Sequence, residues 1–487
     1  MSAQYEAVIG IECHVELKTA TKMFCGCPNQ FGGEPNTKVC PVCLGLPGAL
    51  PVPNAKAVEH MIRTGLAFGA RIPDFSKFDR KNYFYPDMPK NYQISQYDMP
   101  LTLGGSVKYW MEDGATKTCR LTRIHLEEDT GKSTHAGSGD GRIAGSSYSL
   151  VDFNRAGVPL MECVSEPELR SAEEAVAYLE ALRLTLLQLG VSDVKMEEGS
   201  LRCDANVSVR PAGSTELGTK TEIKNMNSFR SVHRAIQSEI ERQVAVLRSG
   251  GRIVQETRGW DEVRGETHSM RSKEQAHDYR YFPDPDLVPL EPAAETVERF
   301  RATIPELPWQ RFERFTAEYG LGAKQAAQVV SNGDLAEYLD RVVRKTQRPQ
   351  QSTNLILGDL SRLANESGTP IARSRVTPEA LAELIDLIET KTINSKIAKD
   401  LLERMWQGAG SPKAVVEKEG LAQTSDLATL EKFVDDAVMA NPKVVADYRA
   451  GKTNVAGFLI GQIMKSSGGK ADPALAKDLL LKKLGNF

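Results

Sequence analysis

The first part of the chain alternates between hydrophobic and polar residues over short runs. Three such runs, at residues 8–17, 201–210 and 220–224, are separated by clusters of Gly, Pro and Asn. Alternation with a period of two is typical of strands with one buried face, and Gly, Pro and Asn are typical of turns. The pattern therefore predicts a region of strands and loops up to about residue 225.

Two segments within and after this region follow a helical period instead. Residues 171–189 begin with Ser171-Ala-Glu-Glu174, the pattern of a capping box, and end before Gly190. A second segment after Ser228 places hydrophobic residues at helical spacing and ends at Gly250-Gly251. These features predict two long helices that accompany the strands.

The pattern changes around residues 283–289, and from about residue 295 onward amphipathic helices with short breaks dominate. A Gly/Ser/Pro segment at 408–412 marks a further break. A chain of 487 residues is long enough for about three domains. We predict domains at residues 1–293, 294–408 and 409–487, and a flexible Gly/Ser-rich surface loop at 136–147.

Composition indicates a folded protein without a uniformly basic surface. Hydrophobic residues make up 41%, charged residues 26%, and the net charge is −3, which excludes a disordered chain and a histone-like binder. Residues 443–487, however, carry a local excess of Lys and Arg, which is typical either of a solvated helical surface or of a surface for RNA. Neither a signal peptide nor a membrane-spanning segment is indicated, so we expect a cytoplasmic protein with reduced thiols and no membrane partner.

Four of the eight cysteines form two close pairs that are separated by twelve residues, namely Cys25, Cys27, Cys40 and Cys43. Two thiol pairs across a short loop suit Zn²⁺, which closes a structural site with four soft ligands. The alternative is four structural thiols without a metal. We predict a zinc-binding insert at residues 25–43, and we expect the other four cysteines to face the core.

A second set of metal-type ligands lies on the predicted strands. Alternation places Glu12, His14 and Glu16 on one strand face. Glu162 lies in a hydrophobic run, where a lone carboxylate is unfavourable unless it is paired or bound to a metal. Hard oxygen ligands around one His favour Mg²⁺ over a second Zn²⁺. A solvated strand face is the alternative interpretation.

Two further segments have side chains that suit phosphate binding. Along residues 200–210 one strand face is polar, with Ser200, Arg202, Asp204, Asn206, Ser208 and Arg210. Residues 79–86 combine cations with aromatic rings, a combination that can bind a phosphate and a planar base. The first pattern is also that of any half-exposed antiparallel sheet, and the second is also that of a packed loop.

Six segments, taken together, resemble a known family. They are VIGIECHVEL (8–17), KFDRKNYFYPD (77–87), HLEEDTGKSTH (125–135), LVDFNRAGVPLME (150–162), MEEGSLRCDAN (196–206) and DYRYFP (278–283). In this order they are similar to the B subunit of the bacterial aspartyl/glutamyl-tRNA amidotransferase, and the likeness extends over essentially the whole chain. The motifs are long and specific, so coincidence is not a serious explanation.

The resemblance implies an α+β fold, in which an antiparallel-sheet cradle is followed by a helical domain and a small all-helical tail that contacts tRNA. It implies ATP-dependent phosphorylation of the side-chain carboxylate of Glu on tRNA(Gln) or Asp on tRNA(Asn), followed by amidation with ammonia derived from glutamine. The expected partners are the tRNA and two other proteins of a heterotrimer, namely an amidase (glutaminase) and a small third protein. The expected cofactors are ATP, Mg²⁺ and Zn²⁺.

The resemblance also places the metal, with Glu12 and Asp204 nearby, and our own hypothesis adds Lys81, Arg202 and Asn206 as phosphate and substrate contacts. Mg²⁺ is expected on His14, Glu128 and Glu162, although alternation alone would place Glu127, not Glu128, on the face of His125. The expected catalytic residues are Glu12, Lys81, Arg202, Asp204 and Asn206. The expected nucleotide contacts are Lys81, Tyr83, Tyr85, Ser200 and Arg202.

Two other hypotheses remain open at this point. A non-catalytic, zinc-stabilised scaffold for tRNA explains the cysteines and the basic C-terminal segment, but it leaves the acidic residues without a purpose. A metallohydrolase would use the same His and carboxylates. Mg²⁺-dependent ATP turnover that misacylated tRNA stimulates distinguishes the amidotransferase from both.

Overall fold

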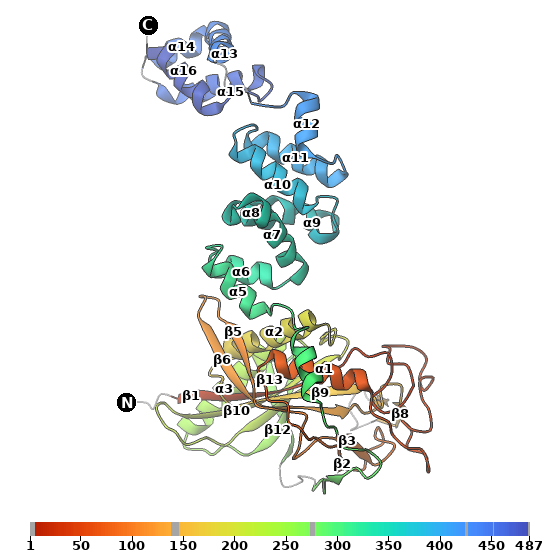
Figure 1. Ribbon diagram of the computed structural model, residues 1–487. Helices are drawn as coiled ribbons and strands as arrows, with labels where there is room; N and C mark the ends of the chain where they lie inside the picture. The colour runs from red at the N-terminus through yellow and green to blue at the C-terminus, as the bar shows by residue number, and fades with distance from the viewer. Residues whose placement is uncertain (1–4, 138–145, 273–277, 424–426, 451, 486–487) are drawn as a thin grey trace. The chain divides into compact units, whose positions relative to one another are not determined.

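The computed structural model describes residues 5–137, 146–272, 278–423, 427–450 and 452–485. The chain divides into two compact units, Met1–Arg311 and Phe312–Phe487. The first unit combines a large sheet with helices, whereas the described part of the second is helical (Figure 1). The α+β fold with a helical C-terminal region is therefore confirmed. No helix in these ranges is long and apolar enough to cross a membrane.

The first unit is organised around a nine-stranded sheet in the order β13-β12-β11-β10-β1-β9-β6-β4, with β5 paired to β6. The strands are β1 Tyr5–Glu16, β4 Thr102–Leu103, β5 Ser106–Trp110, β6 Thr116–Glu128, β9 Pro159–Ser165, β10 Leu201–Pro211, β11 Thr221–Lys224, β12 Glu256–Asp261 and β13 Glu266–Ser272. Neighbouring strands are antiparallel except β11 and β12, which run parallel. The central strands β9, β1 and β10 come from distant parts of the sequence, so the sheet gathers residues that are far apart along the chain.

The register of these central strands separates two chemically different faces. His14 on β1 lies opposite Glu162 on β9 and Arg202 on β10. One position earlier, Cys13 lies opposite Cys163 and Cys203, and all three thiols are buried in the main hydrophobic core. Because successive side chains point to opposite faces, one face of the sheet is polar and the other is core. The expectation that these cysteines face the core is confirmed.

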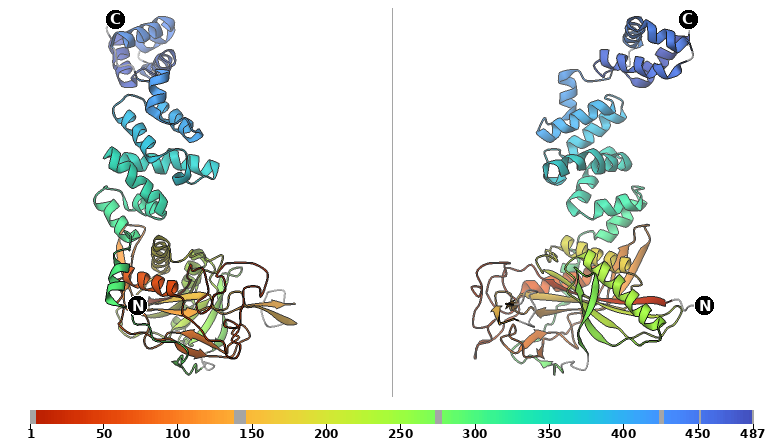
Figure 2. Two further views of the ribbon diagram at one scale, coloured as in Figure 1. Left: turned by 45° about the vertical axis from the view of Figure 1, so that its right-hand side comes forward. Right: turned by 180° about the vertical axis from the view of Figure 1, so that it is seen from behind.

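Three helices contribute to the core on the side of Cys13. They are α1 Ala55–Ala67, α2 Ala172–Leu189 and α3 Phe229–Arg248, on one side of the sheet (Figure 2). As the capping box predicts, Ser171 accepts a hydrogen bond from the Glu174 backbone N–H. The helix ends at Gly190, whose φ of 68° is a left-handed conformation that glycine adopts without strain. Helix α3 is likewise capped by Ser228.

Two small sheets accompany the large one. The first has the order β14-β2-β3, with β14 Phe282–Pro283, β2 Asp79–Asn82 and β3 Tyr92–Ser95. The second pairs β7 Lys132–Ala136 with β8 Tyr148–Asp152. Most of the segment predicted as a surface loop at 136–147 lies between β7 and β8, and its residues 138–145 lie outside the described residues.

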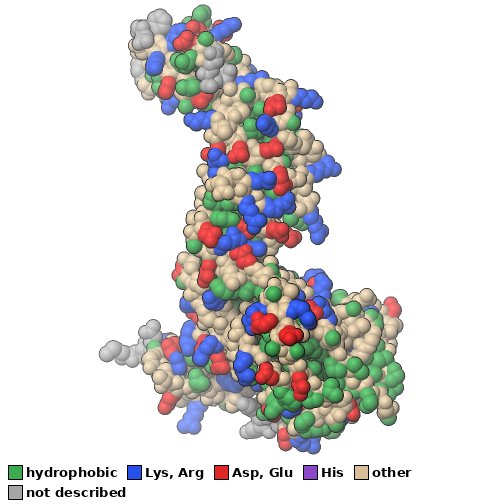
Figure 3. Space-filling view, in the orientation of Figure 1, with side chains coloured by type: hydrophobic (Ala, Val, Ile, Leu, Met, Phe, Trp, Pro, Cys, Tyr) green, Lys and Arg blue, Asp and Glu red, His purple; other side chains and the backbone are tan. Residues whose placement is uncertain are grey.

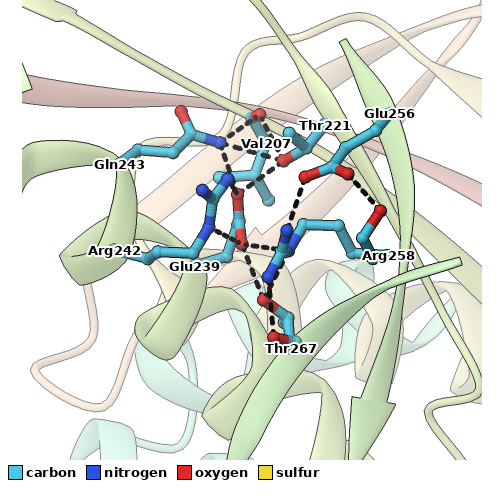
Figure 4. Close-up of polar contacts among 9 residues, drawn as sticks. Val207, Thr221, Glu239, Arg242, Gln243, Glu256, Arg258 and Thr267 are labelled. Carbon is cyan, nitrogen blue, oxygen red and sulfur yellow. Dashed lines mark hydrogen bonds and ion pairs between the residues drawn. The ribbon is translucent and has the colours of Figure 1, made fainter. Parts of the chain in front are cut away.

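A buried polar network ties α3 to the edge of the large sheet (Figure 4). The Glu239 side chain has no exposed surface, and its carboxylate accepts hydrogen bonds from Thr221, Thr267 and Gln243. It also pairs with Arg242 at 2.6 Å and with Arg258 at 3.4 Å. The carboxylate is thus satisfied from β11, β12, β13 and α3 together, which makes its burial tolerable.

The first unit extends beyond the predicted boundary at residue 293. Helix α4 Ala294–Arg301 and the residues after it pack against the core of this unit through Val297, Phe300, Ile304 and Trp309. The spacing of the hydrophobic residues in this segment predicts the start of a separate helical domain. In the structure, however, these hydrophobic residues pack against the first unit. The sequence pattern shows that a helix is amphipathic without showing what it packs against.

The second unit contains short helices. They are α5 Pro308–Ala317, which begins in the first unit, α6 Ala323–Val330, α7 Gly333–Thr346, α8 Pro349–Leu355, the π-helix Ile356–Leu360, α9 Ser361–Ser367, α10 Pro378–Glu389, α11 Ser395–Gln407, α12 Pro412–Glu419, α13 Leu427–Ala440, α14 Pro442–Arg449, α15 Ala456–Ser466 and α16 Pro473–Gly485. Two 3₁₀ turns lie at Ile371–Arg373 and Thr453–Val455. Residues Leu430, Val434, Leu459, Ile463 and Leu480 belong to a separate core of α13–α16. This core falls within the predicted tail, while the division at residue 408 stays a prediction.

Candidate active site

Three metal-type ligands converge on the polar face of the large sheet. His14 comes from β1, Glu127 from β6 and Glu162 from β9, and one ligand atom of each lies within 4.8 Å of the others. The strand order β1-β9-β6 causes this convergence, because the register places Glu162 between His14 and His125. His14 Nε2 is 3.5 Å from Glu162 Oε2. A nitrogen and two carboxylate oxygens at this spacing can hold a divalent cation.

A second imidazole, His125, adjoins these ligands. Its Nε2 is 3.4 Å from Glu162 Oε2 and 3.7 Å from Glu127 Oε2. Among the described residues its buried Nδ1 has no hydrogen-bond partner. Burial raises the pKa of Glu162, but the adjacent side chains of His125, His14 and Lys81 together outweigh it and hold that pKa well below its ordinary value. The carboxylate therefore stays ionised, as a metal ligand must be.

Glu128 is not brought into this group. Its carboxylate points away from the ligands, accepts a hydrogen bond from the Ile94 backbone N–H at 3.0 Å and forms an ion pair with Lys90. The reason is the alternation of β6, which places Glu127 on the polar face and Glu128 on the other. The geometry thus favours Glu127 over the Glu128 that the family resemblance indicates.

Cationic side chains border the same ligands and line a cavity of about 360 Å³. The residues lining it are His14, Lys81, Tyr83, Gln93, Glu127, Asp129, Thr130, Leu160, Arg202, Cys203, Asp204, Lys224, Asn225, Met226 and Asn227. Burial lowers the pKa of Lys81, but Glu127 and the other acidic groups around it together outweigh this effect and raise that pKa above its ordinary value. Lys81 is therefore an ammonium within the cavity.

Two carboxylates, Asp129 and Asp204, orient three other cations. Asp129 pairs with the Arg202 guanidinium at 2.6 Å and with Arg155 Nε at 3.7 Å. Burial raises the pKa of Asp129, but the two arginines hold it below its ordinary value. Asp204 pairs with Lys224, whose pKa is lowered by burial but raised overall, by Asp204 above all, to about 12. Carboxylates that fix cations at a cavity wall produce a preorganised anion site.

The remaining predicted residues divide into two groups. Asn206 donates a hydrogen bond to Glu12 Oε1 at 2.9 Å, and burial raises the pKa of Glu12. These two residues lie on the polar face beside the ligands. Tyr85 and Ser200 do not line the cavity: the Tyr85 side chain is 58% exposed, and the Ser200 hydroxyl closes a turn with Lys195. The geometry gives neither of them a place in the site.

Sequence reasoning did not assign roles to His125, Asp129 and Lys224. Alternation along β6 was the available signal for His125 and Glu127, which are two residues apart. No comparable signal existed for Asp129 and Lys224, because their partners Arg202 and Asp204 are on other strands. Such pairings depend on the register between distant strands.

The four cysteines of the insert do come together. One Sγ atom from each of Cys25, Cys27, Cys40 and Cys43 lies within 4.8 Å of the others. The thiol of Cys25 lowers the pKa of Cys43 to about 5 by a hydrogen bond, against the effect of burial. The fully buried Lys22 adds to this lowering, since its Nζ is 3.7 Å from Cys43 Sγ. Four clustered thiols with one held as a thiolate fit Zn²⁺.

A short segment connects the cysteine insert with the polar face. A Cβ atom on Gly157 would lie 3.5 Å from the side chains of Lys22 and Cys43, and the Gly157 backbone N–H donates to the Asp129 carbonyl at 2.9 Å. The Lys22 ammonium also donates to the Phe153 carbonyl at 3.2 Å. The insert therefore supports the loop that positions Asp129 and, through it, Arg202.

Comparisons with known proteins agree with one another. The chain matches the family model described as "GatB/GatE catalytic domain" over residues 7–298 and that described as "GatB domain" over residues 337–484. It is 56% identical over 481 residues to the B subunit of the aspartyl/glutamyl-tRNA(Asn/Gln) amidotransferase of Moorella thermoacetica, covering 99% of this chain and 100% of that protein. Proteins of the same name from Carboxydothermus hydrogenoformans and Thermosynechococcus vestitus are 51% and 52% identical, each over 99% of this chain and over 100% and 97% of their own lengths.

Proposed function

Because the chain belongs to the family of aspartyl/glutamyl-tRNA(Asn/Gln) amidotransferase B subunits, we propose that its cavity phosphorylates the carboxylate of the misacylated amino acid. The protein is part of a tRNA-dependent amidotransferase, a ligase of protein biosynthesis. The proposed step takes the γ-phosphoryl group of ATP to the side chain of Glu on tRNA(Gln), Asp on tRNA(Asn) or both. Ammonia derived from glutamine then displaces phosphate and forms the amide.

The observation that carries this proposal is the pairing of ligands and cations in one cavity. A carboxylate is a poor acyl donor because its leaving group would be oxide, whereas an acyl phosphate releases phosphate. Phosphoryl transfer requires mainly alignment and neutralisation of charge. The lining residues His14 and Glu127 represent the ligands, and Lys81, Arg202 and Lys224 supply cations within reach of the same space.

The chain's own residues divide the work. His14, Glu127 and Glu162 would hold Mg²⁺, which supplies charge neutralisation at the phosphate oxygens when it is bound. Arg202, fixed by Asp129, offers its guanidinium to a phosphate oxygen in a set orientation. Lys81 offers an ammonium at the cavity wall, where it contacts either the phosphoryl group or the substrate carboxylate.

Other parts of the chain have supporting roles in this proposal. The four insert cysteines would hold a structural Zn²⁺ that keeps the loop around Gly157 in place. The helices α13–α16 would contact the body of the tRNA. We propose a cytoplasmic heterotrimer in which the other two proteins are a glutaminase and a small third protein. The relatives are named as one subunit of an enzyme, which supports a complex.

The rival scaffold hypothesis is not favoured. A tRNA-binding scaffold has no use for two carboxylates and an imidazole whose ligand atoms converge within 4.8 Å of one another. A family model described as a catalytic domain also covers the residues that form the cavity.

Replacement of Glu162 by Gln tests the proposal. In the complex with its partner proteins, Glu162→Gln should lower the rate of ATP-dependent amidation of Glu-tRNA(Gln) or Asp-tRNA(Asn) by roughly 100-fold or more, because an ionised ligand is lost. Circular dichroism should show an intact fold. The matched control is Glu180→Gln, an exposed carboxylate on α2, which should leave the rate unchanged. Retained transfer in the Glu162→Gln enzyme would contradict the assignment.

A further inference from the structure

A row of four tyrosine rings leads outward from the cavity. Tyr83 lines the cavity, and its ring centroid is 6.1 Å from that of Tyr279. Tyr279 is 6.1 Å from Tyr281, which stacks on Tyr97 with a centroid distance of 4.3 Å and an interplanar angle of 12°. Each ring therefore touches the next, from the inside of the cavity to the surface.

The backbone around the row is firmly held. The Asn82 backbone N–H donates to the Tyr279 carbonyl at 2.9 Å, and the Asn82 side-chain amide donates to the carbonyl of Arg280 at 2.8 Å. Arg280 has a φ of 43°, an unfavourable conformation for a residue with a side chain. Unusual backbone that persists under local anchoring is typical of functional segments. The rings of Tyr279 and Tyr281 are thus preorganised.

The outer end of the row is open to solvent. Tyr97 is 52% exposed, and Phe282, which follows Tyr281 in the chain, is 44% exposed. Figure 3 shows hydrophobic side chains gathered at the lower right of the first unit, where Figure 1 places β2 and β3. At the inner end the ammonium of Lys81 lies 5.1 Å from the centre of the Tyr279 ring. A row of aromatic rings that is exposed at one end and has a cation at the other is suited to single-stranded nucleic acid, which binds by stacking and by charge.

We propose that this tyrosine row is the stacking surface for the single-stranded 3′ end of the misacylated tRNA. The inference rests on the proposed function. In that substrate the amino acid is esterified to the ribose of the terminal nucleotide. When its side-chain carboxylate lies in the cavity, the terminal bases must lie at the border of the cavity. The row begins at that border with Tyr83 and extends away from it to Tyr97.

The adenine of ATP is the other base that aromatic rings can stack on. Tyr83 alone is sufficient for one base at the cavity wall, whereas Tyr97 is three rings farther out. A substitution of Tyr97 therefore separates the two ligands. If the row serves the tRNA, the KM for tRNA changes and the KM for ATP does not.

The test uses the complex of the full-length chain with its partner proteins. Tyr97→Ala should raise the KM for Glu-tRNA(Gln) or Asp-tRNA(Asn) by about 5- to 150-fold, the range expected for one stacked base. The kcat at saturating tRNA should stay within about twofold. Tyr97→Phe, which keeps the ring, should restore the KM. Tyr148→Ala is the matched control, because Tyr148 is 60% exposed and lies outside the row.

A binding measurement with shortened tRNA adds a second criterion. Removal of the terminal single-stranded nucleotides should weaken binding to the wild-type complex, and it should weaken binding to the Tyr97→Ala complex by a smaller factor, because one of the four stacking rings is already absent. An unchanged KM for tRNA in Tyr97→Ala, or an increase in the KM for ATP instead, would overturn the inference. Absence of ATP-dependent amidation in the wild-type complex would instead contradict the proposed function, so the two failures are distinguishable.

Discussion

The buried carboxylate of Glu239 allows a quantitative prediction about the stability of the first unit. Replacement by Gln keeps the shape of the side chain but removes the charge and turns one acceptor oxygen into a donor. Arg242 then loses its compensating charge, whereas Arg258 loses one of two carboxylate partners and keeps its ion pair with Glu256. Their side chains are 29% and 11% exposed, so water replaces the lost partner only in part.

The expected magnitude follows from this geometry. Removal of one partner from a buried ion pair costs about 3–5 kcal/mol, and the partial exposure of Arg242 places the expected loss near the lower end, at about 3 kcal/mol. With an m-value of about 3 kcal/mol per M urea, the unfolding midpoint should fall by about 1 M. Three of the four tryptophans, Trp110, Trp260 and Trp309, belong to the first unit, so tryptophan fluorescence follows its unfolding.

A control and a pH series complete the test. Glu241→Gln changes an exposed carboxylate on the same helix and should alter stability by less than about 0.5 kcal/mol. Burial raises the pKa of Glu239, but its hydrogen bonds, led by that from Arg242, lower it overall, below the ordinary 4.5. Its stabilisation is therefore complete above about pH 4.5 and is lost as the pH falls through the lowered pKa of the folded state. If Glu239→Gln costs no more than Glu241→Gln at pH 7, the network does not stabilise the fold as we describe.

Three further predictions concern the metal sites and the tail. Glu127→Gln should weaken Mg²⁺-dependent activity by at least about 10-fold at an unchanged melting temperature. Glu128→Gln should instead lower the free energy of unfolding by about 3 kcal/mol, because it leaves Lys90 unpaired. The reverse pattern would identify Glu128 as the ligand. A colorimetric chelator should release one Zn²⁺ per chain, and Lys22→Met should weaken Zn²⁺ binding by about 10-fold through loss of the cation beside Cys43; equal affinities would remove Lys22 from the site. Deletion of residues 409–487 should weaken tRNA binding while Mg²⁺-ATP still binds the first unit, and an undiminished tRNA affinity would argue against the tail as a tRNA contact.

Much of the local structure could be predicted from the sequence because the determinants are themselves local. The capping box at Ser171 depends on residues three positions apart, and the cysteine insert depends on two close pairs. The face of His14 follows from the alternation of a single strand. Alternation along β6 indicated Glu127 as the ligand, whereas the likeness to the family indicated Glu128. The observed geometry agrees with the alternation, because Glu127 lies among the ligands and Glu128 does not.

Features that depend on contacts between distant segments could not be predicted. Asp129 and Arg202 are 73 positions apart, and only the strand order brings them together. The network around Glu239 joins a helix to three strands, and each of its residues in isolation resembles an ordinary surface residue. Tyr97 and Tyr281 meet because β14 joins β2 and β3 across almost two hundred residues.

The division of the cysteines between the insert and the core gives the protein two classes of thiol with different chemical accessibility. The insert thiols, such as Cys25 and Cys27, are partly exposed, whereas burial raises the pKa of Cys163 and Cys203 and shields them from reagents. Alkylation in the presence and absence of a chelator would thus reveal the insert thiols first, and the core thiols only when the sheet opens. A mass spectrum of the labelled chain would then show two separate mass increments in one sample. The first would report the metal occupancy of the insert, and the second would report unfolding of the first unit.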